Sequence, residues 1–260
     1  MFAVVLVVAA LNAASHRIIA SLANGWFDAA LSLFNLSAIV WFALFAIVRI
    51  GLEDDDRPAS RADYTIAGLI LLACLLPTRI PALAGLLAGA GYLLATSAPG
   101  SVPRRLATVA LALGGPLFLG PVALNLFGSE LLPLDAWIGG TLSGHPVVGN
   151  VIQTPLGQPD LMIMPGCSAF NNLTIVLLLA LTLAQLLQVR FGRRMVTAVG
   201  SACLAMILLN GSRLASMAIW PEHFDWLHTG GGAVLFGYAA LLVMAPIVGF
   251  AVLRSARDAA

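Results

Sequence analysis

Apolar runs long enough to cross a membrane fill most of the chain, and short breaks rich in glycine, proline or arginine separate them. A transmembrane helix needs about 20 mostly apolar residues. The pattern predicts eight such helices, at residues 2–22, 28–49, 64–78, 80–98, 105–127, 168–189, 195–215 and 229–252. We therefore expect an all-α fold, a polytopic transmembrane helical bundle that forms a single domain over residues 1–260.

The first run has some features of a signal peptide, although His16 and Arg17 interrupt it. Because it lacks a basic segment at its start, we expect it to remain as a helix of the protein.

Composition agrees with a membrane protein. Hydrophobic residues make up 60% of the chain and charged residues 10%, whereas soluble domains carry about 25% charged residues. The net charge of +1 gives no reason to expect nucleic acid as a partner. Three cysteines without a C-x-x-C pair argue against a zinc or disulfide framework, and we expect no metal and no cofactor. Cys74 and Cys203 lie inside apolar runs and are expected to be small buried side chains, which leaves Cys167 as a free thiol.

The arginines predict the orientation. If the helices alternate, ten of the 13 basic residues fall on one side: Arg49, Arg57, Arg61, Arg104, Arg105, Arg190, Arg193, Arg194, Arg254 and Arg257. An excess of arginine in short loops marks the cytoplasmic side. Both termini are therefore expected in the cytoplasm, with the chain in the inner (plasma) membrane. The acidic run Glu53–Asp56 would be a solvated cytoplasmic turn.

The longest stretch without a predicted span lies on the outer side, at residues 129–166. Its glycines and prolines predict a loop, while its many apolar residues argue against disorder. We expect this loop to lie on the membrane or dip into it and to roof a site. It would separate five N-terminal helices (1–128) from three catalytic helices (167–260).

Candidate chemistry gathers on the same outer side. Cys167 follows a Pro-Gly break and directly precedes the sixth predicted helix. The partial positive charge of a helix N-terminus favours the nucleophilic thiolate. Arg213 is near the outer end of the seventh helix, where it is either a snorkelling anchor or a functional charge that stabilises an oxyanion or the thiolate. His228 opens the eighth helix and is the candidate general base, with His223 as an alternative.

His228, Gly232 and Phe236 would share one helix face at a spacing of four residues. A glycine at the middle position would let a neighbouring helix approach the base closely. Three different helices could thus bring the thiol, the imidazole and the guanidinium to the same membrane depth.

These residues resemble the exosortase/archaeosortase family of membrane-embedded cysteine transpeptidases. The resemblance rests on Cys167-Ser168 entering a helix, on Asn210-x-x-Arg213 in the next helix, and on His228 followed by Gly232 and Phe236. It implies an enzyme that cleaves the C-terminal sorting signal of secreted proteins: a short motif, a transmembrane helix and a basic tail. Cleavage would occur outside the membrane through a thioester, and the chain would pass to an acceptor at the cell surface, such as a glycan or a lipid.

By the same resemblance Cys167 is the nucleophile, His228 the acid/base and Arg213 the electrostatic stabiliser. Ser168, Asn210 and Gly232 would complete the binding site, and His223 remains the alternative base.

A transporter or a component of polysaccharide export is the alternative function. Such proteins place ionisable residues near the bilayer midplane and often have repeat symmetry. Here the charges cluster at the ends of the runs and no internal repeat is found. The chain also lacks a His-Glu-x-x-His motif, so the sequence does not indicate a zinc protease of that type.

Overall fold

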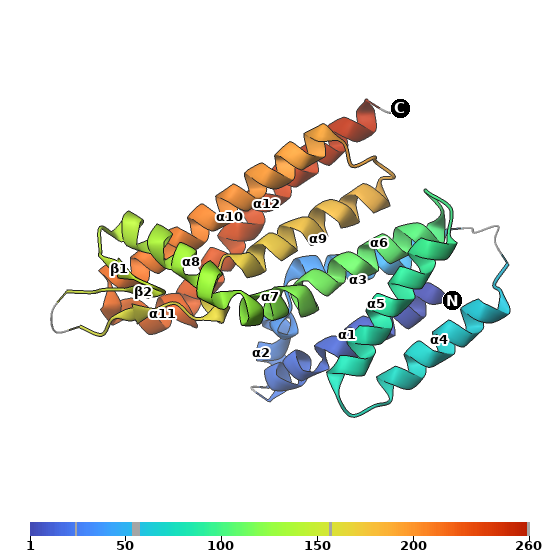
Figure 1. Cartoon of the computed structure of the whole chain (residues 1–260), viewed down its shortest axis with the longest axis horizontal. Helices are drawn as coiled ribbons and strands as arrows, with labels where there is room; N and C mark the ends of the chain where they lie inside the picture. Colours follow the sequence, from blue (N-terminus) through green and yellow to red (C-terminus); the bar gives the residue numbers. More distant parts are fainter. Residues whose placement is uncertain (24, 54–57, 156–157, 259–260) are drawn as a thin grey trace. The chain divides into compact units, whose positions relative to one another are not determined.

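Helices form most of the chain in the computed structural model, which describes residues 1–23, 25–53, 58–155 and 158–258 (Figure 1). Within these residues, five helices are long and apolar enough to cross a membrane. They are α1 (Phe2–Leu22), α5 (Arg79–Thr96), a continuous helix over Val102–Leu126, α10 (Arg193–Ile219) and α12 (Gly231–Arg257). The helix over Val102–Leu126 consists of α6 (Val102–Gly114), a π-helical turn and α7 (Gly120–Leu126). The predicted all-α, polytopic membrane fold is confirmed, while the number of eight spans and the side of the termini stay predictions.

Three predicted spans correspond to shorter helices. These are α3 (Ala38–Gly51) and α4 (Arg61–Cys74), with 14 residues each, and α9 (Phe170–Leu186), with 17. At 1.5 Å per residue, a helix of 14 residues is about 21 Å long, which is less than the roughly 30 Å of the hydrocarbon core.

The predicted helix over residues 28–49 is interrupted. It consists of α2 (Trp26–Leu31), a 3-10 turn at Leu33–Asn35, and α3. Leu33, Phe34 and Asn35 all have positive φ angles, which a right-handed helix excludes. The hydroxyl of Ser37 then caps α3 by accepting a hydrogen bond from the N–H of Val40 at 3.3 Å.

The chain divides into two compact units, and the first comprises mainly residues 1–118 and 177–190. Within it α1 packs against α3, α4, α5 and α6 (Figure 1). A small residue permits the close packing of α5 on α4: a Cβ on Gly89 of α5 would lie 2.5 Å from Cδ1 of Ile70 in α4.

A buried ion pair connects segments of the first unit that the arginine pattern predicts to be on the cytoplasmic side. Arg105, which is only 4% exposed, forms an ion pair with Glu53 at the end of α3. Its guanidinium also donates to the carbonyl of Gln185 near the end of α9, at 2.6 and 2.9 Å. Glu53 is therefore an ion-pair partner rather than part of a solvated turn. The rest of that predicted turn, residues 54–56, lies outside the described residues.

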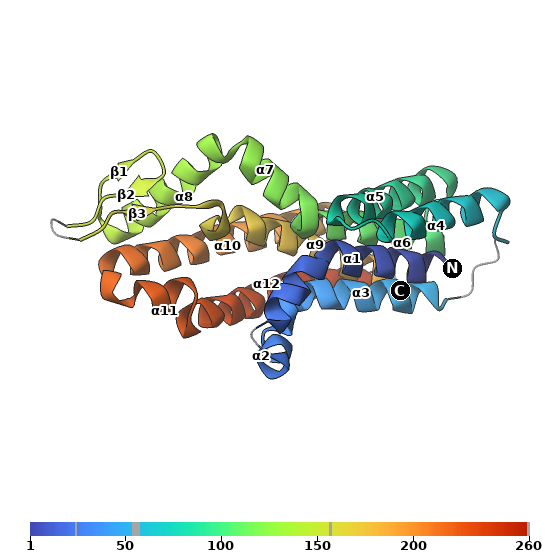
Figure 2. The same cartoon turned by 90° about the horizontal axis from the view of Figure 1, so that it is seen from below.

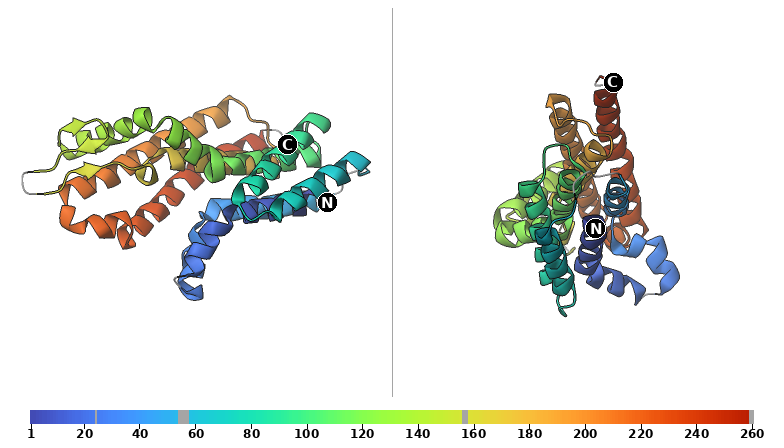
Figure 3. Two further views of the ribbon diagram at one scale, coloured as in Figure 1. Left: turned by 60° about the horizontal axis from the view of Figure 1, so that its bottom comes forward. Right: turned by 90° about the vertical axis from the view of Figure 1, so that its right-hand side faces the viewer.

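The second unit comprises residues 119–176 and 191–257. Its central helix, α10, packs against α8 (Gly128–Ser143) on one side and against α12 on the other (Figure 2). The short α11 (Phe224–His228) packs against both α10 and α12. Figure 3 shows the same order, with α8 and the strands on one side of α10 and α11 on the other.

The predicted loop over residues 129–166 contains regular structure. Residues up to Ser143 belong to α8, and three two-residue strands follow: β1 (Val147–Val148), β2 (Val151–Ile152) and β3 (Leu161–Met162). They pair in order as an antiparallel sheet, with Val147 opposite Ile152 and Val151 opposite Met162. The buried positions of α8 recur at helical spacing, namely Leu132, Asp135, Ala136, Gly139 and Gly140. Because two glycines and an aspartate occupy this face, the apolar periodicity of α8 in the sequence is weak, and the helix was not predicted.

A hydrophobic core in the second unit surrounds Cys167. Its other buried members come from α7, α8, the strands and their flanks, α10 and α11: Leu124, Leu132, Ala136, Ile152, Leu161, Ile163, Leu214, Met217, Ala218 and Leu227. The sheet and α8 therefore pack in the same core as the candidate nucleophile. Cys74 and Cys203 are half-buried rather than buried as expected, and all three cysteines are free thiols.

Candidate active site

Cys167 lies in a tight turn ahead of α9. Pro165–Cys167 form a single 3-10 turn in which the N–H of Cys167 donates to the carbonyl of Met164 at 2.8 Å. The helix begins only at Phe170, so the thiol is not directly at its N-terminus as predicted.

His228 is the last residue of α11 and does not open the following span. The N–H groups of Thr229 and Gly230 both donate to the carbonyl of Asp225 at 3.0 Å, which ends α11, and α12 starts at Gly231. The prediction that His228 and Gly232 share one helix face is therefore wrong. A Cβ on Gly232 would lie 2.7–2.9 Å from ring atoms and the backbone carbonyl of Trp226, so this glycine permits the close approach of α11, the helix that ends at His228.

The thiol and one of the two candidate imidazoles are in contact. Sγ of Cys167 and Nε2 of His228 are 3.4 Å apart, within hydrogen-bonding distance for sulfur. The ring of Phe224, one turn earlier in α11, stacks on the imidazole with ring centroids 4.9 Å apart and restricts its rotation. His223 is in a different place: its side chain is 60% exposed, and its Nδ1 lies 3.4 Å from the carboxylate of Glu222.

Arg213 binds the backbone of the segment that carries the candidate base, His228. Its Nε donates to the carbonyl of Leu227 at 3.0 Å, and one terminal nitrogen donates to the carbonyl of His228 at 2.8 Å. These two bonds orient the fork of the guanidinium towards the end of α11. In this state the guanidinium is bonded to the backbone beside the candidate base, and its role at an oxyanion or a thiolate stays a prediction.

Asn210 and Ser168 make polar contacts on the other side of the thiol. The amide of Asn210 in α10 donates to the carbonyl of Cys167 at 2.8 Å. The hydroxyl of Ser168 donates to a carboxylate oxygen of Asp135 at 2.6 Å. It also accepts a hydrogen bond from the N–H of Phe170, which caps the start of α9.

Asp135 is a buried residue of this site that the sequence analysis missed. Its second carboxylate oxygen accepts a hydrogen bond from the N–H of Ala169 at 3.1 Å. Burial raises the pKa of the Asp135 carboxyl above its usual range, and its bonds to Ser168, Ala169 and Asn210 oppose that shift. The signal in the sequence was a single carboxylate within an apolar stretch, Leu134-Asp135-Ala136-Trp137.

The structure thus brings together five of the predicted site residues: Cys167, Ser168, Asn210, Arg213 and His228. A model of the transmembrane exosortase family matches residues 26–245 of the chain. The chain belongs to this family. No curated protein and no solved structure matches it. As a transmembrane exosortase with several membrane-crossing helices, it is a multi-pass membrane protein of an enzyme family.

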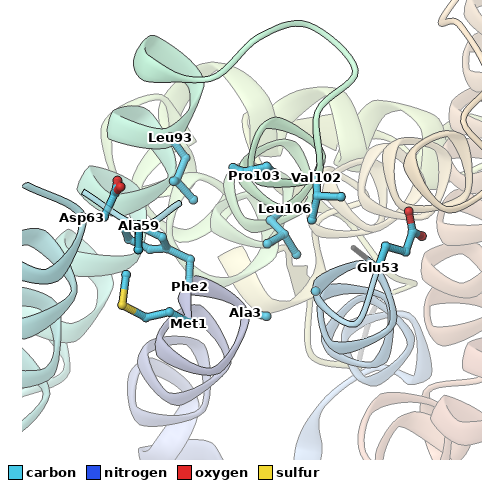
Figure 4. Close-up of a pocket in the computed structure, with 11 residues that line it drawn as sticks. Met1, Phe2, Ala3, Glu53, Ala59, Asp63, Leu93, Val102, Pro103 and Leu106 are labelled. Atoms are coloured by element: carbon cyan, nitrogen blue, oxygen red, sulfur yellow. The ribbon is translucent and has the colours of Figure 1, made fainter. Parts of the chain in front are cut away.

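The exosortase also has a cavity of about 210 Å³, which lies wholly in the first unit (Figure 4). Two carboxylates, Asp63 and Glu53, line it together with apolar side chains of α1, α5 and α6. Both are engaged: Asp63 accepts hydrogen bonds from the hydroxyls of Ser60 and Tyr92, and Glu53 pairs with Arg105. None of its lining residues is among those that surround Cys167.

Within the described residues, no three His, Cys, Asp or Glu side chains are grouped so that they could hold a metal ion. The chemistry that the site offers is that of a thiol beside an imidazole.

Proposed function

We propose that this exosortase is a cysteine transpeptidase or endopeptidase in which Cys167 is the nucleophile and His228 the acid/base. The observation that carries the proposal is the distance of 3.4 Å between Sγ and Nε2. A nucleophile and a base within hydrogen-bond reach, with the base oriented by a third group, are the signature of covalent catalysis. Here Arg213 is the orienting group, because it binds the carbonyl of His228.

The reaction would follow the course of acyl transfer. Nε2 of His228 takes the proton of the Cys167 thiol, and the thiolate attacks the carbonyl carbon of the scissile peptide. As the C–N bond breaks, the imidazolium returns the proton to the leaving amine, and the new chain end stays on Sγ as a thioester. An acceptor nucleophile, or water, then gives a proton to His228 and attacks the thioester, which frees the thiol.

We further propose that the substrate is a secreted protein with a C-terminal sorting signal, consisting of a short motif, a transmembrane helix and a basic tail. Cleavage would occur on the extracytoplasmic side, opposite the face that carries most of the arginines. The acceptor would be a glycan or lipid at the cell surface. Membership of the exosortase family supports this substrate class.

The test is co-expression of the enzyme with a tailed secreted protein, followed by mass spectrometry of that protein. A C-terminal cut is expected with the wild type and should disappear with Cys167→Ala. Cys203→Ala is the matched control, because it removes a half-buried thiol outside the site. If Cys167→Ala still cuts the substrate, the thiol is not the nucleophile and the proposal fails.

A further inference from the structure

The buried carboxylate of Asp135 has no part in the acyl-transfer steps, yet it is only 7% exposed and lies among apolar side chains of α8. Burial of a charge is costly unless hydrogen bonds compensate for it. The bonds that compensate all involve the surroundings of the thiol: the hydroxyl of Ser168, the N–H of Ala169 and the side chain of Asn210.

These bonds fix the turn of Cys167 from the side of α8. Ser168 and Ala169 are the two residues between the thiol and α9, and each is bound by one oxygen of the same carboxylate. From α10, Asn210 binds the carbonyl of Cys167 itself. The backbone around the nucleophile is therefore held by two different helices.

The base is held by α10 as well. Arg213 follows Asn210 by three residues, so the two side chains are neighbours on the helix surface. Asn210 binds the segment of Cys167, and Arg213 binds the carbonyl of His228. The distance between the sulfur and the imidazole thus depends on two contacts with α10: the bond of Asn210 to the turn of Cys167, and the bond of Arg213 to His228.

We propose that Asp135 is a positioning residue of the exosortase: its carboxylate holds the turn of Cys167 in place, so that Sγ faces Nε2 of His228. This rests on the proposed role of Cys167 as the nucleophile. A misplacement of about 1 Å at a reacting group costs on the order of 10²-fold in rate. Asp135 acts through the hydroxyl of Ser168 and the N–H of Ala169 and does not touch the reacting atoms.

A simpler role for Asp135 would be to stabilise the start of α9 without influencing the thiol. The two roles differ in what a change does to folded enzyme. A stabilising residue alters the fraction of folded protein, but the folded molecules keep the same kcat and the same thiol reactivity. A positioning residue alters both in molecules that are still folded.

The experiment uses the full-length enzyme in detergent with Cys74 and Cys203 replaced by Ala, so that Cys167 is its single thiol. One measurement is the rate of alkylation by iodoacetamide as a function of pH, which needs no substrate. The other is kcat and KM for cleavage of a tailed substrate. Asp135→Ala removes the carboxylate, and Asp135→Asn keeps an acceptor for the N–H of Ala169.

We expect Asp135→Ala to lower kcat on the order of 10²-fold with KM within about twofold, and to move the alkylation midpoint to higher pH as the imidazole loses contact with sulfur. Asp135→Asn should retain most of both. The matched control is Asp160→Ala, since this exposed carboxylate binds only the N–H of Thr154 within the described structure. It should behave as wild type.

The proposal is overturned if Asp135→Ala is folded and leaves both measurements unchanged, or if Asp135→Asn is as impaired as Asp135→Ala. Where Asp135→Ala does not fold, Ser168→Ala removes one of the two bonds, and an unchanged alkylation profile in that variant also overturns it. Cleavage that persists in Cys167→Ala refutes the proposed nucleophile instead, and the alkylation profile still reports whether Asp135 sets the position of the thiol.

Discussion

Replacement of Arg213 by Gln should separate a role in holding the base from a role at the oxyanion. The change removes two hydrogen bonds from a charged group to the carbonyls of Leu227 and His228. Such bonds contribute about 1.5–3 kcal/mol each, and we take the lower value because the side chain is only half-buried. The sum of about 3 kcal/mol corresponds to a loss of somewhat more than 10²-fold.

If Arg213 holds His228, this loss appears before any substrate binds. We expect Arg213→Gln to lower kcat by about 10²-fold and also to shift the pH profile of Cys167 alkylation, because sulfur and imidazole separate. Arg213→Lys can replace only one of the two bonds with good geometry, since a lysine lacks the planar fork. It should fall between the wild type and Arg213→Gln in both measurements.

The assay pairs steady-state cleavage of a tailed substrate with alkylation of the single-thiol enzyme. Ser212→Ala is a suitable control, because the neighbouring hydroxyl is exposed and bonds only to the carbonyl of Leu208 in its own helix within the described residues. A large fall in kcat with an unchanged alkylation profile would refute our reasoning. It would mean that the guanidinium acts only in the transition state, as an oxyanion stabiliser does.

Three other predictions concern the base, the helix packing and the buried acid. His228→Ala should lower the rate of cleavage by about 10²–10⁴-fold, while the rate of His223→Ala should stay within about twofold of wild type. Equal losses of rate in the two variants would contradict the assignment of His228 as the base. Gly211→Ala should destabilise the fold by about 1–3 kcal/mol, because its Cβ would lie 2.4 Å from a side-chain atom of α8. Gly200→Ala in the same helix is the control: its Cβ meets nothing within 4 Å, so the melting temperature should be unchanged or higher. The pKa of Asp135 is raised in the folded state, so as pH rises above about 4 the carboxyl loses its proton first in the unfolded state. The stability of wild type relative to Asp135→Asn should therefore decline with rising pH and level off above the raised pKa. If thermal unfolding shows the same difference between the two proteins at every pH, the pKa of the carboxyl is not raised.

Much of the membrane architecture could be predicted from apolar run length. The ends of α1 agree with the prediction, and α5, α10 and α12 agree to within a few residues at most of their ends. The break between α2 and α3 was missed because Ser32, Asn35 and Ser37 are too few to lower the hydropathy of the run. What interrupts the helix is local backbone geometry and a serine cap, which a hydropathy window does not register.

The candidate site was predicted in its residues but not in their contacts. Cys167, Arg213 and His228 could be grouped because the predicted spans place them at the outer ends of three successive helices. The partners of Arg213 are backbone carbonyls. Because every residue has a backbone carbonyl, these partners cannot be predicted from residue types. Asp135 comes from α8, a helix that the sequence analysis had treated as a loop, and only the packing of α8 on α10 brings its carboxylate to the turn of Cys167.

The burial of Cys167 restricts which reagents can reach the proposed nucleophile. Cys167 is 6% exposed, whereas Cys74 and Cys203 are half-buried. A bulky maleimide would therefore react poorly with Cys167. A selective inhibitor would have to be small enough to reach a thiol enclosed by α8 and the short strands. Profiling of membranes with large thiol probes would therefore overlook Cys167, although this thiol lies beside an imidazole.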